Sequence, residues 1–289
     1  MKQMNVNTKW IGLVGNPLGH SMSPIMHNSV YPEMGLDWLY MPMEVKNDQI
    51  KDLLTGMRQM PFIGCNVTIP AKVAIMKYLD ELDPLAEKIG AVNTLLFDKH
   101  RAIGFNTDGE GFVKDLERSK GIHCKGETFL IIGAGGAARA IGMTLATRGA
   151  KKIWIANRTR KKADALAQAI NDNIGPCSES VGLKDQELKK IINKTQVLIN
   201  TTSVGLYPHV ENLPIEASFI RPHLMVVDII YNPMETKLLK LAANKGCETL
   251  NGVGMFVNQG AEAIQIWSGL QAPVEKMKQI VLKTLNHDR

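Results

Sequence analysis

Apolar and polar residues alternate along this chain in short, regular segments. Runs rich in Ile, Leu and Val end in turn residues, and the segments after them carry apolar residues at helical spacing. This alternation predicts an α/β fold with largely parallel sheets. We expect strands at 10–15, 39–45, 62–67, 91–97, 102–106, 128–132, 152–156, 196–200, 224–230 and 248–250. We expect helices at 48–58, 71–79, 84–90, 110–118, 139–146, 187–193, 234–245, 255–266 and 273–285, with another that starts at Pro24.

The glycine-rich turn after the run at 128–132 is the most informative single motif. The pattern Gly133-x-Gly135-x-x-Ala138 stands between a predicted buried strand and a predicted helix, the context that a dinucleotide fingerprint requires. Gly133 permits the turn, Gly135 lets a pyrophosphate approach the backbone, and Ala138 lets the helix pack closely. The free N–H groups at the helix start favour phosphate. A dinucleotide site is therefore predicted; the plainer alternative is a packing corner.

The residues after the strand at 152–156 indicate which dinucleotide binds. An NAD site usually places an acid about 20 residues beyond the first glycine. This chain instead reads Asn157-Arg158-Thr159-Arg160-Lys161-Lys162, with cations and no carboxylate. Guanidinium groups bind a 2′-phosphate, which a carboxylate would repel, and a helix start is a poor place for cations that serve only solvation. We therefore expect NADP, with NAD left open as an alternative cofactor.

Polar and ionisable residues also follow the predicted strands of the N-terminal half. Lys72 falls in the first turn of a helix that Pro70 opens, where a cation opposes the helix dipole; it serves either catalysis or solvation. Asp108 is a natural N-cap for the helix after it. Ser21 and Ser23 lie where a strand end meets a helix start, a usual place for ligands, although Ser23 is also a natural N-cap.

Composition narrows the class of protein. The chain has 289 residues, 45% of them apolar and 21% charged, which is typical of a soluble enzyme with two compact units. Its four cysteines stand singly, so we expect reduced thiols in the cytoplasm and no metal. His20 and His27 lack partners at metal-ligand spacing and are expected to be structural. The net charge of +6 is dispersed, without a leader or a membrane-length apolar run, and we expect no nucleic-acid or membrane partner.

Taken in order, these motifs resemble the shikimate dehydrogenase family, including its quinate/shikimate branch. The resemblance covers nearly the whole chain. It is carried by Gly15-Asn16-Pro17, Ser21-Met22-Ser23-Pro24, Asn66-Val67-Thr68-Ile69-Pro70-x-Lys72, Gly90-Ala91-Val92-Asn93-Thr94, Gly104-Phe105-Asn106-Thr107-Asp108-Gly109, Gly133-Ala134-Gly135-Gly136-Ala137, Asn157-Arg158-Thr159, Asp228-Ile229-Ile230-Tyr231-Asn232-Pro233, and Gly254-Met255 with Gln259.

The resemblance implies an activity and an organisation. Members of the family reduce 3-dehydroshikimate reversibly to shikimate with NADP, in chorismate and aromatic amino-acid biosynthesis, without a metal. It implies a substrate-binding catalytic domain at 1–108, an NADP-binding Rossmann domain at 109–253, and C-terminal helices at 254–289 that complete the substrate domain. It also implies a small-molecule substrate as the partner, while the sequence leaves a monomer and a homodimer both open.

Site residues are carried over position by position. Lys72 and Asp108 would be the catalytic pair, since hydride delivery to a ketone needs a proton for the developing alkoxide. The substrate would be held by Ser21, Ser23, Asn66, Thr68, Asn93, Tyr231 and Gln259. The cofactor would be held by Gly133, Ala134, Gly135, Gly136, Ala137, Asn157, Arg158, Thr159, Arg160, Lys162, Thr202, Gly252 and Met255.

Three functions are weighed. An NADP-dependent shikimate dehydrogenase is favoured, although some members place Arg at the position of Lys162. A quinate/shikimate dehydrogenase that accepts NAD is the second; Trp267-Ser268-Gly269 looks akin to that branch, but its usual acid near Thr159 or Arg160 is absent. Paired serines at 21 and 23 favour shikimate. The third is a non-catalytic NADP-binding regulator on the same fold, against which the pair of Lys72 and Asp108 argues.

Overall fold

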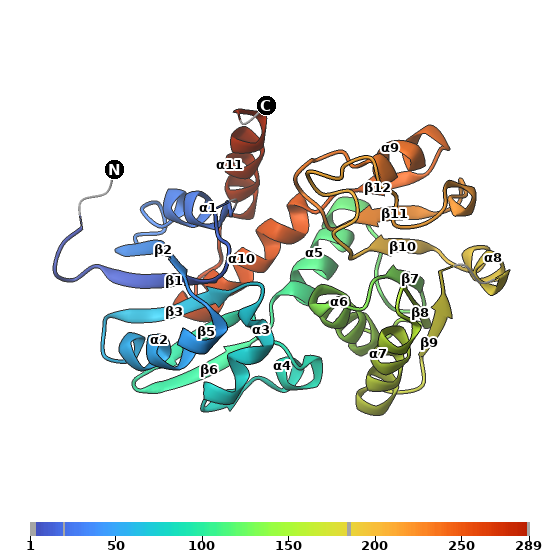
Figure 1. Cartoon of the computed structure of the whole chain (residues 1–289). Coiled ribbons are helices and arrows are strands. Elements are labelled where there is room, and N and C mark those ends of the chain that lie inside the picture. The colour runs from blue at the N-terminus through green and yellow to red at the C-terminus, as the bar shows by residue number, and fades with distance from the viewer. Residues whose placement is uncertain (1–3, 20, 184–185, 288–289) are drawn as a thin grey trace. The chain divides into compact units, whose positions relative to one another are not determined.

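The computed structural model describes residues 4–19, 21–183 and 186–287, and His20 lies outside the described residues. The chain divides into two compact units (Figure 1). Unit 1 comprises residues 1–108 together with 257–289, and unit 2 comprises residues 109–256. Unit 1 is therefore built from two segments that are far apart in the sequence, with the continuous unit 2 inserted between them.

Unit 1 contains a six-stranded mixed sheet in the order β2-β1-β3-β5-β6-β4. β1 is parallel to β2 and β3, and β5 is antiparallel to β3 and β6. Its elements are β1 (Lys9–Gly15), α1 (Ser23–Val30), β2 (Trp38–Glu44), α2 (Ile50–Met57), β3 (Phe62–Val67), α3 (Ala71–Ala74), β4 (Glu81–Leu82), α4 (Pro84–Ile89), β5 (Thr94–Asp98), β6 (Arg101–Phe105) and α11 (Val274–His287). Two helices cross the unit boundary, α5 (Asp108–Lys120) and α10 (Val253–Ser268).

Helix α10 is fixed to the unit 1 sheet by a close approach that requires glycine. The Trp267 indole N–H donates to the Leu95 carbonyl oxygen at 2.8 Å. A Cβ atom at Gly64 would lie 2.4 Å from the indole nitrogen and 2.1 Å from that carbonyl oxygen. Since real Cβ atoms do not come so close to other atoms, glycine at this position of β3 lets the indole reach β5. The C-terminal segment thereby becomes part of the core of unit 1.

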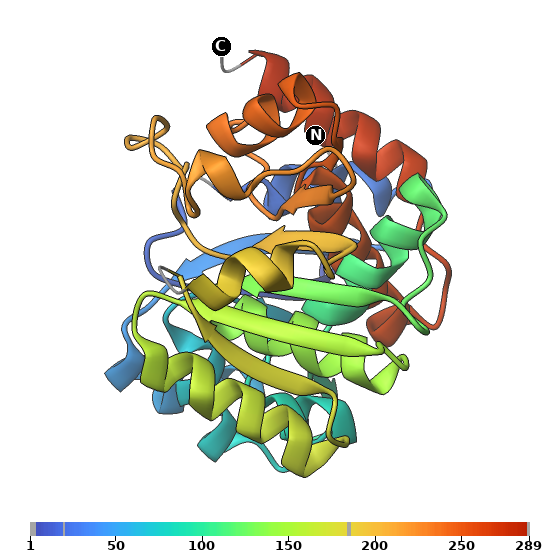
Figure 2. The ribbon, with the colours of Figure 1, turned by 90° about the vertical axis from the view of Figure 1, so that its right-hand side faces the viewer.

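Unit 2 is a doubly wound α/β unit. Its elements are β7 (Thr128–Ile132), α6 (Gly136–Thr147), β8 (Lys152–Asn157), α7 (Arg160–Asn173), β9 (Ser178–Gly182), α8 (Gln186–Ile192), β10 (Val197–Asn200), β11 (Met225–Asp228), α9 (Lys237–Asn244) and β12 (Glu248–Leu250). Every strand pair is parallel, in the order β12-β11-β10-β7-β8-β9, and helices lie on both faces of the sheet (Figure 2). The strand order reverses at β7, where such folds bind their ligands.

The predicted α/β class with largely parallel sheets is confirmed, with local differences. Ser23 is the first residue of α1 rather than its N-cap, and its N–H donates to the Ser21 hydroxyl oxygen at 3.3 Å. The predicted helix at 71–79 is interrupted: α3 has four residues, and a 3₁₀ turn follows at Met76–Tyr78. Leu79 is extended, which stops the helical hydrogen bonds and leads into β4. No helix within the described ranges is long and apolar enough to cross a membrane.

Candidate functional site

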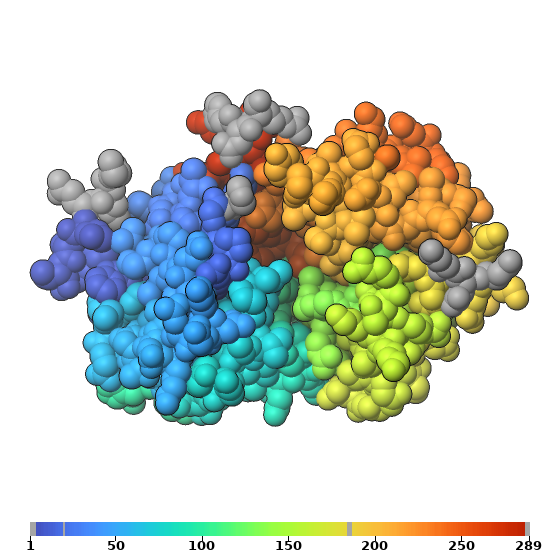
Figure 3. Space-filling view, viewed as in Figure 1, coloured from blue at the N-terminus to red at the C-terminus, as the bar shows by residue number. Residues whose placement is uncertain are grey.

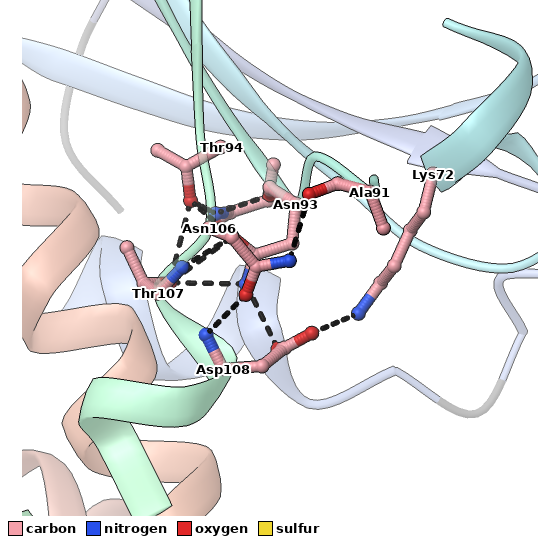
Figure 4. A network of polar contacts seen from close by, with 8 residues as sticks. Lys72, Ala91, Asn93, Thr94, Asn106, Thr107 and Asp108 are labelled. Atoms are coloured by element: carbon pink, nitrogen blue, oxygen red, sulfur yellow. Dashed lines mark hydrogen bonds and ion pairs between the residues drawn. The ribbon is translucent and has the colours of Figure 1, made fainter. Parts of the chain in front are cut away.

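Lys72 and Asp108 form an ion pair in unit 1 (Figure 4). The Lys72 Nζ atom lies 2.5 Å from Asp108 Oδ2, and the two side chains are 21% and 10% exposed. The backbone of Lys72 is also fixed, because its carbonyl oxygen accepts the Val92 N–H at 2.9 Å. A charge pair that is mostly shielded from water interacts more strongly than one on the open surface, and the Lys72 side chain is not completely buried.

The carboxylate of Asp108 points toward Lys72 and Asn93 and not toward the backbone of α5, the helix that begins with Asp108. Its Oδ1 atom accepts from Asn93 Nδ2 at 2.8 Å, while Oδ2 accepts from Lys72. The backbone N–H of Asp108 donates to Asn106 Oδ1 at 3.1 Å. The predicted capping role of Asp108 is not observed, because Asp108 is the first residue of α5 and its carboxylate accepts from Lys72 and Asn93 instead.

Asn93 is the centre of a buried polar network around this pair (Figure 4). Its Nδ2 atom also donates to the Thr107 hydroxyl oxygen at 3.0 Å. Its Oδ1 atom accepts the Thr107 N–H at 2.8 Å and the Thr94 hydroxyl at 3.1 Å. With donors on one side and acceptors on the other, the amide can point only one way. The network thus fixes the carboxylate of Asp108 in one orientation toward Lys72.

Strand directions bring the predicted unit 1 site residues to one edge of the sheet. The parallel strands β1 and β3 are followed by Ser21 and Thr68, respectively. β5 is antiparallel to β3, so Asn93, which precedes β5, lies at the same edge. β6 is antiparallel to β5, and its carboxyl end leads to Asp108 there. Residues from four strands therefore meet at this edge because of topology.

The remaining substrate predictions are distributed over both units. Ser21, Thr68 and Gln259 are half-buried in unit 1, and Ser23 and Asn66 are buried there. Tyr231 belongs to unit 2, where its ring stacks on Phe256 with centroids 4.7 Å apart. Burial raises the pKa of Tyr231 above its usual value. Sequence reasoning did not single out the network members Thr94, Asn106 and Thr107, nor Tyr40, whose hydroxyl donates to Asn66 Oδ1 at 2.8 Å; their signal is a polar side chain at or beside an apolar strand.

The glycine turn of unit 2 has the predicted strand–turn–helix form. Gly133 has a φ of +117°, and a Cβ atom there would lie 2.4 Å from the Thr201 hydroxyl oxygen. That hydroxyl donates to the Ile132 carbonyl oxygen at 2.8 Å, so the two loops are joined. Gly135 precedes α6, and no side chain caps the helix start. The turn follows β7 at the point where the strand order reverses, so the free N–H groups of α6 suit an anion.

The basic segment after β8 contains both free and bonded cations. Arg158 and Lys162 are exposed, and their side chains have no hydrogen bond or ion pair with any described residue. Arg160 differs, because its guanidinium donates to Asp164 Oδ1 at 3.0 Å and to the Ser180 carbonyl oxygen at 3.1 Å. Arg158 and Lys162 are therefore cations that an arriving phosphate can engage without breaking an existing bond, and the exposed Lys161 is a third.

A second buried polar network lies at the ends of β10 and β11. Asp228 accepts from Thr236 Oγ1 at 2.7 Å, from Asn200 Nδ2 at 3.0 Å and from the Ile230 N–H at 3.2 Å. Burial raises the pKa of Asp228 to about 6, an effect that these hydrogen bonds partly oppose. Asn200 Oδ1 in turn accepts the Thr202 N–H and hydroxyl. Thr202 is thus held at the same edge as the glycine turn.

Gly252 and Met255, the other two predicted cofactor residues, follow β12. The Gly252 N–H donates to the Ile230 carbonyl oxygen at 3.0 Å, and a Cβ atom at Gly252 would lie 1.9 Å from the Ile229 carbonyl oxygen. Met255 is buried in α10.

The chain after β10 forms an exposed part of the unit 2 surface (Figure 3), where Tyr207 is 81% exposed. Among the described residues, no group of His, Cys, Asp and Glu is arranged to hold a metal ion.

The fold and the residues at the two sheet edges, one in each unit, together indicate a class of enzyme. A doubly wound sheet with a glycine turn at its reversal point is suited to a dinucleotide. A shielded Lys–Asp pair among buried amides and hydroxyls is suited to proton transfer on a polar substrate. Together they define a dinucleotide-dependent oxidoreductase with a separate substrate-binding unit.

Comparisons with known proteins agree. The model of the shikimate dehydrogenase substrate binding domain matches residues 13–95, that of shikimate/quinate 5-dehydrogenase matches 115–241, and that of the shikimate 5′-dehydrogenase C-terminal domain matches 252–282. The shikimate dehydrogenase (NADP(+)) of Methanopyrus kandleri is 41% identical over 98% of both chains. That of Bacillus licheniformis is 44% identical over 95% of this chain and 96% of the relative.

A solved structure has the same fold. Shikimate 5-dehydrogenase from Listeria monocytogenes, in complex with shikimate and NAD, has a TM-score of 0.92 and 39% identity, covering 97% of this chain and 99% of that one. The chain belongs to the shikimate dehydrogenase family. The predicted family and the predicted enzyme class, an NADP-dependent oxidoreductase, are confirmed.

Proposed function

We propose that this protein catalyses the reversible reduction of 3-dehydroshikimate to shikimate with NADP. The observation that carries the proposal is the ion pair between Lys72 and Asp108, held in one orientation by the Asn93 network. The relatives from Methanopyrus kandleri and Bacillus licheniformis, both named shikimate dehydrogenase (NADP(+)), support it over nearly their whole length. A non-catalytic regulator would have no use for such a pair.

Lys72 has the central chemical role in this proposal. When bound, NADPH supplies a hydride to the carbonyl carbon of the substrate. The ammonium group of Lys72 donates a hydrogen bond to the carbonyl oxygen and then its proton, so that the alkoxide never carries a full charge in a shielded site. Asp108 keeps the amine in place, because the two groups lie 2.5 Å apart. The reverse reaction uses the same groups with Lys72 as the base.

The polar residues around this pair supply selectivity. We assign substrate binding to Ser21, Ser23, Asn66, Thr68, Asn93, Tyr231 and Gln259. A site built from hydroxyls and amides rejects an analogue that lacks one substrate hydroxyl, because a buried polar group is then left unpaired. Asn93 would take part through the hydrogen bonds that fix the Asp108 carboxylate, because its own amide is already bonded. Residues 1–108 and 254–289 would form the substrate-binding domain.

We assign NADP to residues 109–253, with the glycine turn for the pyrophosphate. Arg158 and Lys162 would hold the 2′-phosphate, since their side chains are exposed and have no partner among the described residues. Thr202, Gly252 and Met255 would line the path to the nicotinamide. We further propose that the protein works in the cytoplasm as a monomer or homodimer, with no nucleic-acid partner.

A steady-state assay with four combinations tests the proposal. Shikimate and quinate are each offered with NADP and with NAD, and reduction of the cofactor is followed by absorbance. We expect the highest kcat/KM for shikimate with NADP. Wild-type protein that turns over neither substrate with either cofactor would overturn the proposal.

A second candidate is a quinate/shikimate dehydrogenase that uses NAD. The observation in its favour is the Listeria monocytogenes relative, which was solved with shikimate and NAD. Against it stands the segment from Asn157 to Lys162, where no carboxylate is present to bind a ribose 2′-hydroxyl. Comparable kcat/KM values for NAD and NADP, or for quinate and shikimate, would favour this candidate over the first.

A further inference from the structure

A buried tyrosine contacts one of the assigned substrate residues. Tyr40 of β2 is 2% exposed. Its hydroxyl donates to Asn66 Oδ1 at 2.8 Å. Asn66 belongs to β3, and β1 lies between β2 and β3 in the sheet. The hydroxyl of a residue on β2 therefore reaches across β1 to a residue of the site.

The amide of Asn66 depends on this hydroxyl for its orientation. Both N–H groups of Asn66 are already used, because Nδ2 donates to the Asn93 carbonyl oxygen at 3.2 Å and to the Thr94 hydroxyl oxygen at 3.0 Å. Tyr40 is the protein donor to Oδ1. Asn66 consequently offers a ligand an acceptor lone pair and no free N–H. The direction of that lone pair is set by the Tyr40 contact.

The hydrogen bonds continue from Asn66 to the reacting groups. The Thr94 hydroxyl that accepts from Asn66 donates to Asn93 Oδ1 at 3.1 Å. The Asn93 amide then donates to Asp108, which holds Lys72. Tyr40 is thus linked to the catalytic pair through side chains that are all bonded to one another, although it does not itself contact Lys72.

An aromatic cluster keeps the Tyr40 ring in place. The ring stacks on His27 with centroids 4.4 Å apart and planes 6° from parallel, and Trp267 lies 6.5 Å away. Burial raises the pKa of the Tyr40 hydroxyl well above its usual value, so that the hydroxyl keeps its proton and its donor role. The rigid ring leaves the hydroxyl little freedom to move.

We propose that Tyr40 is a positioning residue that acts through Asn66 to set the affinity for a ring bearing several hydroxyls and a carboxylate. This inference rests on the proposed function, since it concerns the substrate side of the same site. Tyr40→Phe keeps the ring and removes only the hydroxyl, leaving Asn66 Oδ1 without its donor. The loss should be felt in substrate affinity and not in cofactor affinity, because NADP is assigned to unit 2.

Tyr31 provides a matched control. It is fully buried, and its hydroxyl lies 3.1 Å from Nδ1 of the same His27. The structure gives its hydroxyl no contact with an assigned substrate residue. Tyr31→Phe therefore removes a buried hydroxyl from the same cluster without touching Asn66, and it reports any general effect of loosening the cluster.

The experiment compares full-length wild type, Tyr40→Phe, Tyr31→Phe, Asn66→Ala and the double variant Tyr40→Phe/Asn66→Ala. The KM for shikimate, the KM for NADP, kcat and Tm are measured for each. We expect Tyr40→Phe to raise the KM for shikimate about 10-fold, the ratio that one lost hydrogen bond gives, with kcat and the KM for NADP changed less than about 3-fold. Tyr31→Phe should lower Tm similarly while leaving the KM for shikimate within about 2-fold. The double variant should resemble Asn66→Ala alone, because Tyr40 acts through Asn66.

Equal rises in Tyr40→Phe and Tyr31→Phe, or no rise in Tyr40→Phe, would overturn the inference. Should Tyr40→Phe fail to fold, Asn66→Ala tests the same link, and an unchanged KM for shikimate there counts against it. Inert wild type would overturn the proposed function instead. In that case the shift in Tm caused by added shikimate is compared between the two tyrosine variants. A smaller shift in Tyr40→Phe alone supports the positioning role, and equal or absent shifts oppose it.

Discussion

The predicted functional side chains of the two units differ in their burial and in their hydrogen bonds and ion pairs. In unit 1, Lys72, Asp108 and Asn93 are bonded to one another and mostly buried. In unit 2, Arg158 and Lys162 are exposed, and their side chains have no partner within the described part of the chain. The difference follows from the tasks proposed for them. Proton transfer needs groups that are held in advance, whereas recognition of a phosphate needs cations that are free to meet it.

The largest effect is expected from a substitution in unit 1 that breaks the ion pair between Lys72 and Asp108. We expect Lys72→Ala to lower kcat about 10³-fold, because it removes the proton donor and leaves the Asp108 carboxylate without its cation. Binding of NADP, followed by fluorescence titration, should stay within about 2-fold, since the cofactor is assigned to unit 2. A variant that keeps more than a tenth of wild-type kcat would show that Lys72 is not the proton donor.

A smaller effect is expected from a substitution among the exposed cations of unit 2. We expect Arg158→Asp to raise the KM for NADP about 100-fold, because it replaces a cation that can bind the 2′-phosphate with a charge that repels it. The KM for NAD should not rise. Arg160→Gln is the matched control: its guanidinium is already bonded to Asp164 and Ser180, so we expect a change below about 3-fold. Equal effects of the two substitutions would show that Arg160 shares the contact.

The smallest of the three effects is that of pH on stability. Lowering the pH from 7 to 5 should destabilise unit 1 and stabilise unit 2. Burial lowers the pKa of His27 in unit 1 to about 3 from its ordinary 6.5. Below pH 6.5 the unfolded chain therefore binds a proton that the folded chain does not, and unit 1 loses about 2 kcal/mol between pH 7 and pH 5. Burial raises the pKa of Asp228 in unit 2 from 3.8 to about 6. There the folded chain binds the extra proton, and unit 2 gains about 1 kcal/mol over the same range.

Hydrogen exchange followed by mass spectrometry at pH 5 and pH 7 resolves the two units. Peptides from β1, β2 and α1 should lose protection at pH 5, whereas those from β10 and β11 should not. His27→Phe removes the titrating group, so its unit 1 should show no such loss. Parallel changes in both units would contradict the assignment of the acid sensitivity to His27.

Much of the fold could be predicted from the sequence because local patterns decided it. The apolar runs at 128–132 and 152–156 are strands, and Pro84 and Gly90 bound a helix as predicted. β9 was not predicted, because Val181 is its one large apolar residue and an edge strand needs few. The helix predicted at 71–79 is interrupted because tertiary packing outweighed its apolar spacing.

The side chains of the candidate site were also predicted only where the local sequence gave a signal. Lys72 and Asp108 were singled out as residues whose local positions had a second explanation, and the motifs that contain them suggested the pairing. The capping role of Asp108 is not observed because its partners Lys72 and Asn93 are 36 and 15 residues away in the chain. Tyr40 was missed because a tyrosine within an apolar strand gives no local sign that its hydroxyl meets Asn66.

The divided origin of unit 1 has a consequence for the order in which the chain is made on the ribosome. Unit 2 is continuous, so all of its residues have been synthesised before residues 257–289 appear. Unit 1 must wait for those residues, because Trp267 is needed to fill the space beside Gly64 and α11 packs on α1. Nascent chains that lack this segment should therefore present a folded nucleotide module and an N-terminal sheet without the helices that complete its core. Competence for catalysis arrives only with the last helices to be translated.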